Sequence, residues 1–144
     1  MKNILTKLLS LIAFILIFAT NTFAADLGIT SVTFDNSSSF LTINSHDNED
    51  FKPETLPKLI ISEEEQKVYF DINSSILRCP PQELILNSPD IKEIKVKQFS
   101  LNPNIVRVVI SYSENFNPKN IKLLQVNNTL YVRFKQTKIS NYYF

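Results

Sequence analysis

The chain has 144 residues, enough for one domain and too few for two. Apolar residues make up 44% of it, an ordinary share for a globular protein with a single buried core. The formal net charge is +1 at pH 7, which excludes the globally basic surface of a typical nucleic-acid-binding domain. Any basic surface must therefore be local.

The N-terminus has the pattern of a secretory signal peptide. Lys2 and Lys7 form a short positive region, the apolar run Leu8–Ala19 follows, and Thr22-Phe23-Ala24 offers small residues at the −3 and −1 positions of a cleavage site. The run has about 12 residues, well short of the roughly 20 that span a bilayer. We predict a leader over residues 1–24 and an exported chain with no transmembrane anchor after cleavage. That chain would carry 13 basic and 14 acidic residues, a net charge of −1.

Beyond the leader, apolar and polar residues alternate with a period of two, which predicts strands and no helix. The expected strands cover Leu27–Phe34, Phe40–Asn44, Pro57–Ser62, Lys67–Asn73, Glu83–Leu86, Ile91–Phe99, Ile105–Ser113, Ile121–Val126 and Thr129–Lys135. The residues expected to face inward include Ile29, Val32, Phe34, Leu41, Ile43, Val68, Phe70 and Ile72. Short strands between polar turns predict an all-β fold, a β-sandwich over residues 25–135, with a tail at 136–144.

The connections have their own signals. Gly28 is the only glycine, so turns must be made by Asn, Asp, Ser and Pro. Asn127-Asn128 predicts a two-residue hairpin turn, because Asn tolerates the left-handed backbone that such turns require. Pro80-Pro81 cannot donate hydrogen bonds to a sheet, so Ser74–Asn87 is expected to be an irregular crossing that ends in a short strand.

Several kinds of chemistry lack the residues they need. With one His (His46) and one Cys (Cys79), the chain supplies neither a zinc site nor a convincing nucleophile with its base, and a single glycine excludes phosphate-cradling loops. The acidic runs at 47–50 and 63–65 are typical of solvated loops, with a weak Ca²⁺ contact as the alternative. Cys79 is expected to be a partly buried small residue, with an intermolecular disulfide as the alternative. No metal, cofactor or enzymatic activity is expected.

One strand face gathers positive charge. If Ile94–Phe99, Ile105–Tyr112 and Thr129–Lys135 share a sheet, the face opposite the core collects cations with aromatic rings among them. The candidate ligand-binding residues on it are Lys95, Lys97, Phe99, Arg107, Tyr131 and Arg133, with Lys135 beside them. Cations donate to carboxylates and phosphates, and aromatic rings offer flat area for sugars. The alternatives are an ordinary solvated face and a surface that binds an anionic glycan or a peptide-bearing polymer.

The same stretch resembles the AMIN domain family. In residues 91–112, Gln98-Phe99 and Arg107-Val108-Val109 are similar to its Gln-Phe strand end and Arg-Val-Val step. The apolar-Asp-apolar step Phe70-Asp71-Ile72 and the closing hairpin 127–134 are similar as well. Family members often carry Gly where this chain has Lys97, so Arg107 is the residue expected to serve the family as a whole.

The resemblance implies a β-sandwich of two small sheets with a non-catalytic role in the periplasm or another exported part of the bacterial cell envelope. It implies binding to cell-wall peptidoglycan or another anionic envelope glycan, or localisation of a complex. Its partners in the family are amidases, secretins and pilus proteins. The alternative is a protein–protein interaction subunit of a pilus or secretion assembly. Nucleic acid is not an expected ligand.

Overall fold

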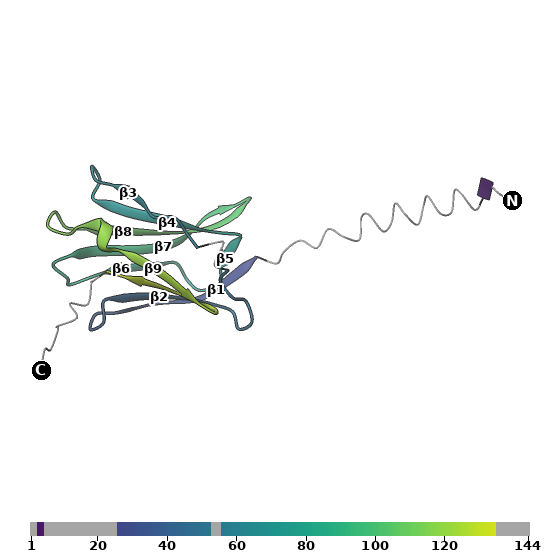
Figure 1. The fold of residues 1–144 in the computed structure, drawn as a ribbon, viewed down its shortest axis with the longest axis horizontal. Helices are drawn as coiled ribbons and strands as arrows, with labels where there is room; N and C mark the ends of the chain where they lie inside the picture. The colour runs from purple at the N-terminus through teal and green to yellow at the C-terminus, as the bar shows by residue number, and fades with distance from the viewer. Residues whose placement is uncertain (1–2, 5–25, 53–55, 135–144) are drawn as a thin grey trace, which may run out of the picture.

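The computed structural model describes residues 3–4, 26–52 and 56–134. In this part of the chain the strands form two five-stranded sheets stacked face to face, so the predicted all-β sandwich is confirmed (Figure 1). The predicted leader (apart from residues 3–4) and tail lie outside the described residues, and cleavage after Ala24 stays a prediction. No helix in the described ranges has the length and apolar character needed to cross a membrane.

The first sheet, called sheet A, has the strand order β5-β1-β2-β10-β9. Its strands are β1 (Leu27–Asp35), β2 (Phe40–Ser45), β5 (Ser75–Leu77), β9 (Lys122–Val126) and β10 (Thr129–Arg133). Only β5 is parallel to its neighbour, and the other pairs are antiparallel. Asn127 begins the β9–β10 turn with a φ of 52°, so the predicted Asn-Asn hairpin is confirmed.

The second sheet, called sheet B, is antiparallel throughout, with the order β3-β4-β8-β7-β6. Its strands are β3 (Ile60–Ser62), β4 (Lys67–Asn73), β6 (Gln82–Ile85), β7 (Ile91–Leu101) and β8 (Asn104–Tyr112). A short 3-10 helix, η2 (Pro118–Asn120), leads from β8 to β9 and so from sheet B back to sheet A. The long β7–β8 pair is central to the candidate site described below.

The core lies between the sheets and follows the alternation. Val68 and Phe70 have no exposed surface, and Ile72 is 3% exposed, as their spacing predicted. On β1 the buried residues Ile29 and Val32 are three positions apart, because the pairing with β2 shifts register between Ile29 and Ser31. Phe34, expected inside, is only half-buried at the end of the sandwich.

Three local expectations need correction. The strand expected at Pro57–Ser62 is limited to Ile60–Ser62. The crossing around Pro80-Pro81 is irregular as predicted, but it begins with β5, which the alternation did not reveal because three residues are too short for a pattern. Gln66 also adopts a left-handed φ of 52°, outside the residue types expected for the turns.

Candidate functional site

The predicted cationic face does not form on one surface. β7 and β8 lie in sheet B, whereas β10 pairs with β2 and β9 in sheet A. Tyr131 and Arg133 therefore lie on the opposite side of the sandwich from Lys95, Lys97 and Arg107. The condition that the three strands share a sheet is wrong, because alternation shows which residues face outward but not which sheet a strand joins. Lys135 lies outside the described residues.

The solvent side of sheet B remains a candidate site, and we call it the B face. It combines residues of four adjacent strands that lie in register across the sheet. Its members are Tyr69, Asp71, Glu83, Glu93, Lys95, Lys97, Phe99 and Arg107. Three of them are cations and three are carboxylates, and Lys67, on the same side of β4, is paired with Glu65 in the adjoining turn, so the charges of the B face nearly balance.

Arg107 is at the centre of the B face, and its charge is satisfied. Its Nε donates to Asp71 Oδ1 at 2.7 Å and its Nη2 donates to Asp71 Oδ2 at 2.9 Å, a bidentate pair between β8 and β4. Its guanidinium carbon lies 3.5 Å from the centroid of the Phe99 ring and 5.0 Å from that of Tyr69. The hydrogen bonds to Asp71 raise the pKa of Arg107 further above its ordinary value. Arg107 therefore orders this surface and has little charge left for a ligand.

Lys95 is also paired. Its Nζ lies 3.4 Å from Glu83 Oε1 on β6 and 3.4 Å from Glu93 Oε1 on its own strand. Hydrogen bonds to Glu83 and then to Glu93 raise the pKa of Lys95. The pKa of Glu83 is lowered, first by a hydrogen bond with Glu93 and then by Lys95. Lys95 thus joins two strands of the B face.

Lys97 is the exception on the B face. Its side chain is exposed and forms no ion pair within the described ranges, although its Cα lies opposite that of Arg107. It attracts Glu83 electrostatically, as the weakest of the causes that lower the pKa of that carboxyl. Phe99, two residues further on, is 55% exposed. The ring that holds Arg107 on one side therefore offers open apolar surface near an unpaired ammonium group. The sequence favoured Arg107 over Lys97 for a role shared by the family, and that role stays a prediction. The pairing of Arg107 with Asp71 leaves Lys97 more open to a ligand.

Gln98 has a role that the sequence did not show. It faces inward opposite Val106, and its Oε1 accepts a hydrogen bond from Leu77 N at 2.7 Å. Its Nε2 donates to the carbonyl oxygens of Ser75, Ser100 and Ile105 at 3.1, 2.8 and 3.0 Å. Gln98 thereby joins β5 of sheet A to the β7–β8 pair of sheet B. In the Gln98-Phe99 step, the first residue supports the fold and the second faces solvent.

The solvent side of sheet A, called the A face, has a different chemistry. Asn44 Nδ2 donates to Ser31 Oγ at 2.9 Å, and Thr129 Oγ1 donates to Asn44 Oδ1 at 2.9 Å, which gives a row of uncharged polar groups. Tyr131 packs edge-on against Phe40, with ring centroids 6.2 Å apart. Lys122 lies opposite Arg133 in the β9–β10 pair.

The other candidate residues of the sequence, Cys79 and the acidic loop, do not belong to either face. Cys79 is a free, half-buried thiol against the core, and burial raises its pKa. Glu49 of the acidic loop accepts a hydrogen bond from Gly28 N at 2.7 Å, so one of these carboxylates fixes the loop to β1. Within the described part of the chain, no three His, Cys, Asp or Glu side chains gather as a metal site would require.

Comparison with known proteins agrees with the fold and with the motifs. No curated protein and no solved structure matches the chain. Residues 32–134 match the model of the AMIN domain, a span that runs from β1 to the end of β10 and covers most of the chain. The chain therefore belongs to the AMIN domain family.

Proposed function

We propose that this AMIN domain is an exported, non-catalytic module that binds cell-wall peptidoglycan through the B face and localises itself, or a partner, in the bacterial envelope. The family and the predicted leader support an exported location in the cell envelope. The B face supports the chemistry, because among the described residues it holds a cation that forms no ion pair, beside an exposed ring, while its other charges are paired. The observation that carries the proposal is the exposed Lys97, without an ion pair in the described part of the chain, two residues before the exposed Phe99.

The chemistry of peptidoglycan fits these two groups. Its stem peptides carry carboxylates, to which Lys97 can donate, and its sugar rings present flat apolar faces that can pack on Phe99. The pairs of Arg107 with Asp71 and of Lys95 with Glu83 add rigidity, which lowers the entropy lost on binding. A solvent-exposed ion pair contributes about 0.2–1 kcal/mol, so one module is expected to bind weakly and in a salt-dependent way.

The test is sedimentation of the purified exported protein with purified sacculi. Lys97→Met should weaken binding about twofold to fivefold, and Phe99→Ala by about twofold to tenfold. Lys122→Met is the matched control, because Lys122 is an exposed lysine on the A face. Binding that is equal in all three variants and the wild type would remove the B face as the contact surface.

A second function is favoured by the edge of sheet A. On the outermost strand β9, Leu124 is 60% exposed and Val126 is 48% exposed, beside Tyr131 on β10. An edge strand with exposed apolar side chains can pair with a strand of a partner protein, such as a subunit of a pilus or secretion assembly. Loss of a stoichiometric co-purifying partner in Leu124→Lys, with sacculus binding absent in the wild type, would support this function over the first.

A further inference from the structure

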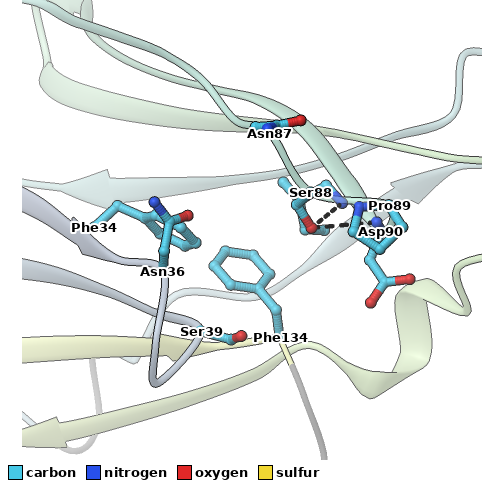
Figure 2. Close-up of a pocket in the computed structure, with 9 residues that line it drawn as sticks. Phe34, Asn36, Ser39, Asn87, Ser88, Pro89, Asp90 and Phe134 are labelled. Atoms are coloured by element: carbon cyan, nitrogen blue, oxygen red, sulfur yellow. Dashed lines mark hydrogen bonds between the residues drawn. The ribbon is translucent and has the colours of Figure 1, made fainter.

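A pocket opens at one end of the sandwich, away from the strand faces. Its volume is about 390 Å³, near the lower end of the roughly 300–1,000 Å³ range of small-molecule sites. Sheet A contributes Phe34, Asn36 and Phe134, and the loop between β6 and β7 of sheet B contributes Asn87, Ser88 and Asp90. Figure 2 shows the Phe134 ring between Phe34 and Asn36 on one side and Ser88 and Asp90 on the other. The pocket therefore lies between the two sheets.

The apolar part of the pocket is aromatic. The rings of Phe34 and Phe134 are 5.9 Å apart between centroids and tilted by 56°. Phe134 is 3% exposed and belongs to the core, whereas Phe34 is half-buried and keeps part of its ring open to the pocket. Because Phe34 packs on a fixed core ring, its side chain is already ordered and can offer apolar area at a low entropic cost.

The polar groups around the rings are available to a ligand. Ser88 Oγ accepts from the backbone N–H groups of Asp90 at 3.2 Å and Ile91 at 3.4 Å, which orients its oxygen and leaves its O–H free to donate. The side-chain amides of Asn36 and Asn87 form no hydrogen bond within the described part of the chain. Each amide offers both a donor and an acceptor.

The charges of the described lining favour an uncharged or cationic ligand over an anionic one. Among the described residues that line the pocket there is no lysine or arginine, and Asp90 contributes a carboxylate. Next to Asn36, the hydroxyl of Ser38 and then that of Ser37 lower the pKa of Asp35 to about 2, so this second carboxylate is ionised at neutral pH. A phosphate or a free carboxylate would be repelled here, whereas an uncharged ligand that bears hydroxyl and amide groups would find matching partners.

We infer that this end pocket binds one uncharged N-acetylated sugar ring, with the apolar face of the ring on Phe34, which packs on the buried Phe134, and its hydroxyl and acetamide groups on Asn36, Asn87 and Ser88. The choice of a cell-wall type of sugar rests on the proposed function. The pocket itself uses none of the residues of the B face. The domain would then contact a glycan polymer at two separate places, one for a carboxylate and one for a neutral sugar.

Three matched oligosaccharides test the chemistry in NMR titrations of the isotope-labelled exported protein. Tetra-N-acetylchitotetraose should give saturable shifts of the backbone amides at 36, 39, 87, 88, 90 and 91. Maltotetraose, which is neutral but lacks acetamide groups, should bind at least threefold more weakly. Chitotetraose, the deacetylated and cationic form, tests whether attraction to the Asp90 carboxylate is enough to explain binding. Tighter binding of chitotetraose, or the absence of saturable shifts at the pocket with the acetylated sugar, would overturn the inference.

Two variants locate the binding. Asn36→Ala and Asn87→Ala remove exposed amides, so the fold should persist, which the spectrum of the free protein checks. Each should weaken binding of the acetylated sugar about threefold to tenfold, and equal affinity in the double variant would contradict the assignment. Lys97→Glu separates the two proposals, because it should leave this affinity unchanged while it reduces sacculus binding. Pocket binding without any effect of Lys97 on sacculi would overturn only the role of the B face.

Discussion

Each sheet has an inward-facing glutamine and an outward-facing arginine that can be compared. Those of sheet B have hydrogen-bond partners, whereas those of sheet A have buried polar atoms without a partner among the described residues. Gln98 of sheet B faces inward and makes four hydrogen bonds, whereas Gln125 of sheet A has both amide atoms buried without a partner among the described residues. Arg107 on the B face forms a bidentate pair with Asp71. Arg133 on the A face has a buried Nε with no hydrogen-bond partner in the same part of the chain.

The difference shows how charge in a strand sequence should be interpreted. Lys95, Lys97 and Arg107 are all cations on outward-facing strand positions, yet Lys95 and Arg107 form ion pairs with carboxylates of neighbouring strands, whereas Lys97 forms none among the described residues. Counting cations along a strand overestimates the positive charge of its surface, because carboxylates such as Asp71, on a strand distant in sequence, neutralise some of them. A ligand is expected to contact the cation that forms no ion pair.

The largest expected effect is on the interior of sheet B. Gln98→Leu removes the partner of Leu77 N and of three carbonyl oxygens, and unsatisfied buried groups cost about 1–3 kcal/mol each when water cannot replace the partner. We expect the free energy of unfolding to fall by about 3 kcal/mol in urea denaturation. A fall below about 1 kcal/mol would show that Gln98 does not join the sheets.

The counterpart in sheet A should change in the opposite direction. Gln125→Leu replaces a buried, unpaired amide by an apolar side chain of similar size, which removes a desolvation cost. We expect the free energy of unfolding to rise by about 1 kcal/mol in the same denaturation series. Destabilisation by this change would mean that Gln125 has partners in the folded protein and that the contrast with Gln98 is wrong.

The two arginines allow a smaller comparison on the surface. Arg107→Met removes a bidentate pair with Asp71 whose side chains are about one quarter exposed, so we expect a loss of about 1 kcal/mol after allowance for solvent screening. Arg133→Met keeps a similar volume and should change stability by less than about 0.5 kcal/mol. If the two changes were equal, the pairing of Arg107 with Asp71 would not stabilise the sheet. High salt should reduce the loss in Arg107→Met.

Asp35, at the end of β1, is a charged residue of sheet A that does have hydrogen-bond partners, the hydroxyls of Ser37 and Ser38. Its pKa of about 2 lies below the ordinary 3.8, so its contribution to stability is present above pH 3.8 and is lost as the pH falls toward 2. Ser38→Ala removes the hydroxyl that lowers this pKa most and should move it toward 3.8 in an NMR titration of the carboxyl group. Ser38→Thr, which keeps a hydroxyl, is the control. An unchanged pKa in Ser38→Ala would contradict the hydrogen bond.

The alternation of residues predicted the sandwich and most of the core, because burial of one strand face imposes a period of two on segments such as Lys67–Asn73. It could not place β10 in sheet A, since strand partners are chosen by tertiary packing. It also could not show that Asp71 neutralises Arg107, which lies 36 positions away. The end pocket escaped prediction for the same reason, because its walls come from loops of both sheets.

The most direct test of the B face compares two charge reversals in binding to purified sacculi at low salt. Lys97→Glu and Lys122→Glu change the net charge of the protein by the same amount, on opposite sides of the sandwich. We expect Lys97→Glu to weaken the apparent affinity about tenfold, because repulsion replaces attraction, and Lys122→Glu to weaken it less than twofold. Equal losses in the two variants would show that only net charge matters, and a larger loss in Lys122→Glu would place the contact on the A face.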